Sequence, residues 1–125
     1  MYFSGTMKRF LYSFSYAFNG IAYAFKTQFN FKVHVVAAVS VLLMGYAVQL
    51  SVNEWLWIVL AIALVMVVEL INTAIEILVD LISPGIHPKA GAIKDLAAGS
   101  VLITAAFALI VASVILLPKL LLYVA

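Results

Sequence analysis

Three long apolar runs limit what this chain can fold into. They cover residues 33–50, 55–82 and 97–117 of the 125-residue sequence. Each run can reach the roughly 20 residues that a helix needs to cross a hydrocarbon core ~30 Å thick. Hydrophobic residues make up 67% of the chain and charged residues 10%, against roughly 45–50% and about 25% in soluble domains. We therefore expect an all-α integral membrane protein with three transmembrane helices.

The length of the chain favours a single membrane-embedded domain, residues 1–125. The segments "SVNE" and "SPGIHP" between the runs carry turn signals. Cysteine is absent, which excludes a disulfide framework and thiolate chemistry. A net charge of +2 gives no support for a nucleic-acid partner.

Residues 7–25 form a different pattern. Large apolar side chains recur at helical spacing on one face, and polar ones lie mostly elsewhere. This pattern predicts an amphipathic helix lying on the membrane surface. A helix packed on the end of the protein's own bundle is compatible with the same pattern.

The basic residues predict the orientation. Those that flank the runs on one side are Lys8, Arg9, Lys26, Lys32, Lys89 and Lys94. Because cytoplasmic loops are enriched in Lys and Arg, we expect the N-terminus and the second loop to be cytoplasmic. Trp55 and Trp57 then fall in an outer aromatic belt.

The second run carries a polar stripe. On a helix turning about 100° per residue, its five polar positions fall within an arc of roughly 100°; they are Glu69, Asn72, Thr73, Glu76 and Asp80. A carboxylate near the bilayer centre costs about 2.5–3.5 kcal/mol even on lenient scales. The stripe must therefore face protein, water or a ligand.

Purely structural explanations apply to some positions of the stripe more readily than to others. Asp80 can simply end the helix in the interface, and Asn72 can make an ordinary interhelical hydrogen bond. Glu69 and Glu76 together favour function. Two acids can hold a divalent cation, a lysine and a helix N-terminus near Lys94 favour phosphate, and a deeper carboxylate can accept a hydroxyl proton.

The segment "ELINTAIEILVDLISPGIHPKAGAIKDLAAGSVLI" resembles the signature of the small prokaryotic diacylglycerol kinase and undecaprenol kinase family. The shared pattern is E-x-x-N-T-A-x-E-x-x-x-D, a short loop containing His, and then K-D. "SFSYAFNGIAYAF" and "FNFKVH" extend the resemblance upstream, so that it covers nearly the whole chain. The resemblance implies a surface helix plus three transmembrane helices, assembled as a homotrimer with active sites between subunits, in the bacterial inner membrane.

The resemblance also implies residue roles. Glu69 matches the catalytic carboxylate, and Glu76 the magnesium ligand that bridges to ATP. The other ATP-binding positions that match the family are Arg9, Tyr16, Gln28, Asn72, His87, Lys94 and Asp95. A solvated loop histidine remains an alternative for His87. Packing within one chain remains an alternative for the small residues 97–100, which subunit contacts could also use.

Gln28 departs from the pattern. The family usually has Glu at this position, as a second metal ligand. A Gln carbonyl can coordinate magnesium but contributes no charge, so we expect weaker metal binding unless another group helps.

Three functions compete. The first is an ATP- and Mg²⁺-dependent lipid kinase, with undecaprenol favoured by the wording of "SPGIHP" and "KDLAAGSVL" and diacylglycerol as the alternative acceptor. The second is a proton- or ion-translocating subunit, although the run's outer half has almost no polar groups. The third is a haem anchor through His34 and His87, which leaves the acids unexplained.

Overall fold

Every element of regular secondary structure in the described part of the chain is an α-helix. The computed structural model describes residues 2–125, with the side chains of residues 5–125. Its helices are α1 (Tyr2–Thr27), α2 (Phe29–Ala47), α3 (Val52–Ile82) and α4 (Pro88–Val124). Among the described residues, α2, α3 and α4 are long and apolar enough to cross a membrane. The expected helical class and the three candidate spans are confirmed.

The helices extend beyond the apolar runs. α4 covers residues 88–124, whereas the apolar run was 97–117. Its first two turns include Lys94 and Asp95, which hydropathy alone leaves outside a span. Pro118 lies within the helix near its other end. Charged residues are compatible with a helical backbone, so α4 continues beyond the apolar run.

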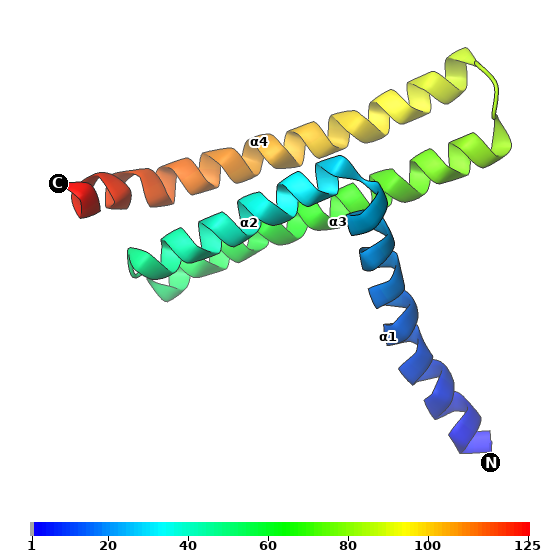
Figure 1. The fold of residues 1–125 in the computed structure, drawn as a ribbon, viewed down its shortest axis with the longest axis horizontal. Coiled ribbons are helices and arrows are strands. Elements are labelled where there is room, and N and C mark those ends of the chain that lie inside the picture. The colour runs from blue at the N-terminus through cyan, green and yellow to red at the C-terminus, as the bar shows by residue number, and fades with distance from the viewer. Residues whose placement is uncertain (1) are drawn as a thin grey trace.

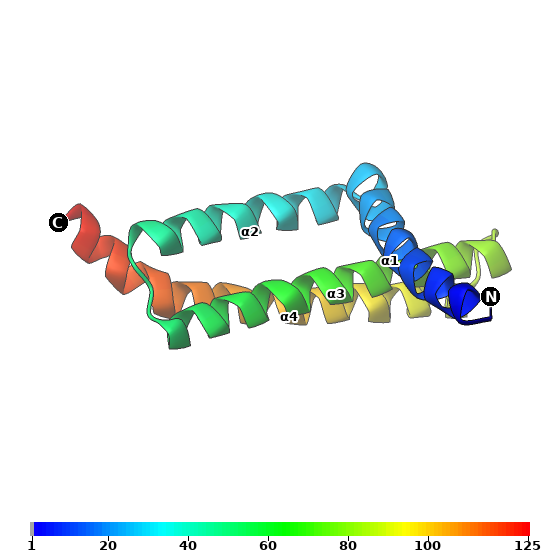
Figure 2. The same cartoon turned by 90° about the horizontal axis from the view of Figure 1, so that it is seen from below.

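The three long helices lie side by side and α1 departs from them. Figures 1 and 2 show α3 and α4 antiparallel along much of their length, with α2 running antiparallel to α3 against this pair. At the start of α2 the chain bends, and α1 extends away from the other helices (Figure 1). The bend is at Gln28, whose backbone is extended (φ −110°, ψ 110°). Among the described side chains of α1, only Ala24 is buried.

The two ends of the bundle differ in character. We call the end with the α2–α3 connection, residues 48–51, the turn end, and the end with Gln28 and the α3–α4 loop, residues 83–87, the site end. A buried apolar cluster occupies the turn end; it comprises Leu50, Ile58, Ala61, Val111 and Leu116. The polar stripe of α3 lies toward the site end, so that apolar packing and polar chemistry are separated along the bundle.

The turn end is fixed by a capping box. Ser51 Oγ accepts a hydrogen bond from the Glu54 N–H, and Glu54 Oε1 accepts one from the Ser51 N–H. Lys119 of α4 donates to the same Glu54 oxygen at 2.7 Å. The "SVNE" segment was expected to be a turn, but α3 already begins at Val52. Ser51 alone of the four residues precedes the helix, where it is the N-cap of the capping box.

Gly45 allows α2 to approach the start of α3, and its replacement is expected to destabilise the fold. A Cβ at Gly45 would lie 2.7 Å from the Trp55 ring and 2.8 Å from Leu50 Cδ1. Overpacking of this kind costs about 1–3 kcal/mol, so Gly45→Val should lower the thermal unfolding temperature in detergent. Gly20→Val is the control, because nothing lies within 4 Å of a Cβ there. Equal effects of the two changes would contradict this packing.

Candidate active site

Burial along the stripe of α3 decreases toward the site end. Glu69 is 1% exposed, and Asn72 and Thr73 are also buried. Glu76, two turns beyond Glu69, is half-buried, and Asp80 is exposed. The stripe therefore leads from the protein interior to the surface at the site end. Such a path suits a reaction between a group held inside the membrane and one that arrives from water.

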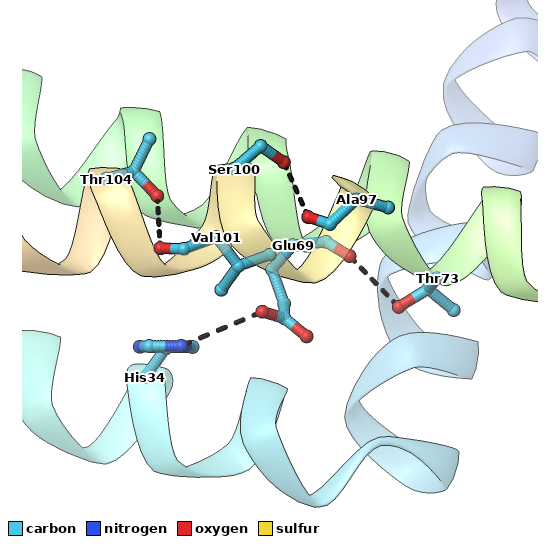
Figure 3. A network of polar contacts seen from close by, with 7 residues as sticks. All are labelled: His34, Glu69, Thr73, Ala97, Ser100, Val101 and Thr104. Atoms are coloured by element: carbon cyan, nitrogen blue, oxygen red, sulfur yellow. Dashed lines mark hydrogen bonds and ion pairs between the residues drawn. The ribbon is translucent and has the colours of Figure 1, made fainter. Parts of the chain in front are cut away.

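The carboxylate of Glu69 lies between α2 and α4 (Figure 3). His34 Nε2 of α2 is 3.7 Å from Glu69 Oε2. Two hydroxyls of α4 lie nearby, and both donate hydrogen bonds to backbone carbonyls of α4: Ser100 to Ala97, and Thr104 to Val101. The Thr73 hydroxyl donates to the backbone carbonyl of Glu69, not to its carboxylate.

Two buried acceptors on α3 have no hydrogen-bond donor among the described residues. They are Glu69 Oε2 and Asn72 Oδ1. Leaving a buried acceptor unpaired costs about 1–3 kcal/mol, and such groups in native proteins often mark a functional site. A ligand that brings a hydroxyl group would supply a missing donor.

An apolar cavity of about 250 Å³ adjoins this site between α2, α3 and α4. Small side chains line much of it, including Ala38, Ala61 and Ala108, and His34 is its one polar lining residue. His34, which contacts Glu69, therefore also borders the apolar cavity. This space suits a hydrocarbon chain whose polar end lies near Glu69.

A second cavity, of about 310 Å³, lies at the α3–α4 loop. Its lining includes Asp80, His87 and Lys94. Lys94 Nζ donates a hydrogen bond to Asp80 Oδ1 and forms an ion pair with it. His87 is the N-cap of α4, where its Nδ1 accepts a hydrogen bond from the Lys89 N–H at 3.1 Å. The loop histidine therefore has a structural role besides any contact with a ligand.

Gln28 and Glu76 both lie toward the site end of the bundle. The contact between His34 and Glu69 fixes the register of the antiparallel helices α2 and α3. Gln28 lies about 9 Å before His34 along the chain axis, and Glu76 about 10 Å beyond Glu69, at ~1.5 Å per residue. Among the described residues, however, no group of three His, Cys, Asp or Glu side chains could hold a metal. A magnesium ion here would need oxygen ligands from its substrate, which is how proteins commonly bind it.

One chain does not bring all the expected site residues together. Asp95 lines a separate open cavity on α4 with Gly99 and Ser100. Arg9 and Tyr16 are exposed on α1, which extends away from the bundle. The described chain thus brings Glu69, Asn72 and Glu76 to one face of α3. The other expected site residues lie at four further places: α1, the bend at Gln28, the α3–α4 loop and the outer side of α4.

The interaction of His34 with Glu69 was not foreseen from the sequence. His34 was considered there only as a candidate haem ligand together with His87. The available signal was a single imidazole inside the apolar run 33–50. The pairing of Asp80 with Lys94 was also missed, although both residues had been singled out.

Comparisons with known proteins agree with the geometry. The family model described as prokaryotic diacylglycerol kinase matches residues 15–116. The chain is 46% identical over 114 residues to the undecaprenol kinase of Bacillus subtilis (strain 168), covering 91% of this chain and 93% of that protein. It is 43% identical over 112 residues to a diacylglycerol kinase of Synechocystis sp., covering 89% of this chain and 64% of that longer protein.

Proposed function

The chain belongs to the prokaryotic diacylglycerol kinase family and is a membrane lipid kinase, and from this premise we propose that it transfers the γ-phosphate of ATP to undecaprenol. Diacylglycerol is the alternative acceptor. The observation that carries the proposal is the buried carboxylate of Glu69, which lacks a donor and lies beside an apolar cavity. The similarity to an undecaprenol kinase over most of both chains favours undecaprenol.

Glu69 acts on the acceptor hydroxyl. The part of the lipid chain next to its hydroxyl occupies the apolar cavity between α2, α3 and α4, so that the hydroxyl donates to the carboxylate. As the lipid oxygen forms a bond to the γ-phosphorus, the bond from that phosphorus to the β-phosphate oxygen breaks. ADP leaves, and the hydroxyl proton passes to Glu69. Asn72, one turn away, orients Glu69 or a phosphate oxygen.

Glu76 and Gln28 hold the metal that accompanies ATP. Both side chains carry an oxygen that can bind a metal and lie toward the site end, and both are half-buried. The chemistry that Mg²⁺ supplies is neutralisation of phosphate charge during transfer. One carboxylate and one amide oxygen, completed by phosphates and water, suit the ion's preference for few protein ligands.

Lys94 contacts the phosphates and the α3–α4 loop borders the nucleotide. Lys94 exchanges Asp80 for a phosphate when ATP binds, because both are anionic partners of the same ammonium group. This ion pair is largely exposed, and exposed pairs contribute only about 0–1 kcal/mol, so that the exchange has a low cost. His87 borders the adenine, and Asp95 contacts the sugar or a supporting partner.

The active enzyme is a homotrimer with sites shared between subunits. Arg9, Tyr16 and Asp95 lie on surfaces that a single chain does not direct at Glu69, and a neighbouring copy can bring them there. α1 lies on the cytoplasmic surface of the inner membrane, where its basic residues and those at the start of α4 are expected. ATP then reaches the site end from the cytoplasm.

A comparison of the two acceptors tests the substrate assignment. The purified protein in mixed micelles should phosphorylate undecaprenol with a higher kcat/KM than diacylglycerol at equal surface concentration. A higher kcat/KM for diacylglycerol would reverse the assignment and leave the kinase activity intact.

Gln28→Glu is expected to lower the Mg²⁺ concentration required for half-maximal activity. A second carboxylate adds negative charge beside Glu76, and carboxylates are stronger ligands of hard cations than amides. The reduction should be about tenfold, measured by magnesium titration at fixed ATP. Gln49→Glu, at the turn end, is the control for added charge. An unchanged requirement in Gln28→Glu would place Gln28 outside the metal site.

A further inference from the structure

His34 and Glu69 form a contact between α2 and α3 that the proposed chemistry leaves without a role for the histidine. The His34 side chain is 22% exposed and that of Glu69 is 2% exposed. Figure 3 shows the imidazole and the carboxylate directed toward one another from the two helices. Apart from His34 and Lys32, the residues of α2 are uncharged.

Among the described residues, His34 is the one that the structure records as an ion-pair partner of Glu69 Oε2. On α3, the nearest ionisable neighbour along the stripe is Glu76, which is itself an acceptor. The described part of α1 contributes buried Ala24 near the bundle, and the α4 hydroxyls of Ser100 and Thr104 already donate to their own backbone. The distance of 3.7 Å from His34 Nε2 to Oε2 exceeds a hydrogen bond by less than 1 Å. A small side-chain rotation closes this gap.

We propose that His34 is a positioning residue for Glu69: its Nε2–H holds Oε2, so that the other carboxylate oxygen faces the acceptor hydroxyl. This inference rests on the proposed role of Glu69 in lipid phosphorylation. The hydroxyl proton passes to the free oxygen of Glu69, and the imidazole keeps its own proton throughout. An imidazole that holds a carboxylate fixes the base within hydrogen-bond reach of its substrate, which general-base catalysis requires.

The location of His34 links positioning to the lipid. The imidazole borders the apolar cavity between α2, α3 and α4, so a hydrocarbon chain in that cavity lies against the ring. Occupation of the cavity then excludes water from the contact between His34 and Glu69. Hydrogen bonds to charged groups strengthen when water is excluded, and the base is oriented most firmly when the acceptor is bound.

Two variants of matched shape separate positioning from packing. Gln and Met are both unbranched and similar in length, but only Gln carries an N–H donor at its end. His34→Met should lower kcat by about 10- to 100-fold, since a hydrogen bond to a charged group is lost, while KM for ATP and lipid changes less than about threefold. His34→Gln should recover most of kcat. Ser40→Ala, on an exposed position of α2, should behave as the wild type.

A spectroscopic measurement makes the test independent of turnover. The chain contains two histidines, so the imidazole NMR signals of labelled protein in micelles can be assigned with His87→Gln. Glu69→Gln should shift the His34 signals and leave those of His87 in place. Unchanged His34 signals would overturn the pairing, whether or not the protein is active.

The kinetic outcomes are equally decisive. Equal losses in His34→Met and His34→Gln, or no loss in His34→Met, would assign His34 to packing alone. If the wild type phosphorylates neither lipid, the proposed function fails, and the NMR result still decides whether His34 pairs with Glu69.

Discussion

Glu69→Gln is expected to reduce kcat for lipid phosphorylation by about 10²- to 10⁴-fold, the range that a positioned general base contributes. The substitution keeps the size and shape of the side chain, so the packing of a residue that is 1% exposed is preserved. It removes the ability to accept the hydroxyl proton. KM for ATP should change little, because nucleotide binding is proposed to depend on other residues. Initial rates in mixed micelles measure both constants.

Glu54→Gln is the matched control for this prediction. It is the same substitution on the same helix, at the turn end, where Glu54 caps α3 and pairs with Lys119. Activity close to that of the wild type is expected, with a modest loss of thermal stability from the weakened cap. If Glu69→Gln retained more than a tenth of wild-type kcat, or lost no more than Glu54→Gln, the catalytic role of Glu69 would be refuted.

Glu76→Gln is expected to weaken the apparent affinity for Mg²⁺ by at least about 10- to 100-fold. Replacing a residue that only hydrogen-bonds to a metal ligand already produces a loss of this size. The reason is the replacement of the one carboxylate proposed to bind the ion. Raising the magnesium concentration should restore part of the rate, in contrast to Glu69→Gln. Magnesium titrations of both variants at fixed ATP measure the difference.

The result that would contradict a metal role is a Glu76→Gln variant with a normal magnesium requirement. A fall in kcat that no magnesium concentration reverses would assign Glu76 to another step. Double substitution with Gln28→Glu provides a further check, because a carboxylate at the second proposed metal ligand should recover part of the affinity.

The three candidate spans could be predicted from the sequence because bilayer thickness fixes the length of an apolar helix. The residues at which the helices begin and end were harder to predict. The apolar run 97–117 underestimated α4, since Lys94 and Asp95 continue the helix toward its N-cap at His87. A change of direction between residues 25 and 33 follows from a surface helix next to a span, but its location at Gln28 was not predicted, because no glycine or proline marks it.

The common face of the polar residues on α3 could be predicted from their spacing and from the cost of a carboxylate in the membrane. Helical periodicity places Glu69, Asn72 and Glu76 on one face, and the high cost of a carboxylate in the membrane indicates that this face is covered. Contacts between helices could not be predicted in this way. Whether His34 meets Glu69 depends on the register of α2 against α3, which side-chain packing determines and no local pattern encodes.

The positions of Arg9, Tyr16 and Asp95 show a second limit. Residues of one motif can lie on different surfaces of one chain, as Lys94 and Asp95 do although they are consecutive. Adjacent helical residues point about 100° apart, so a second copy that covers the face of Asp95 would bring this residue into a shared site. This is the physical basis for proposing shared sites.

The most direct test of the central claim is transfer of labelled γ-phosphate from ATP to lipid by the purified protein in mixed micelles with Mg²⁺. We predict that undecaprenol and, more slowly, diacylglycerol become labelled with stoichiometric release of ADP, and that Glu69→Gln abolishes the labelling. Absence of lipid phosphate with either acceptor, together with proton or ion flux through the protein in sealed liposomes, would contradict the account and favour a translocating subunit.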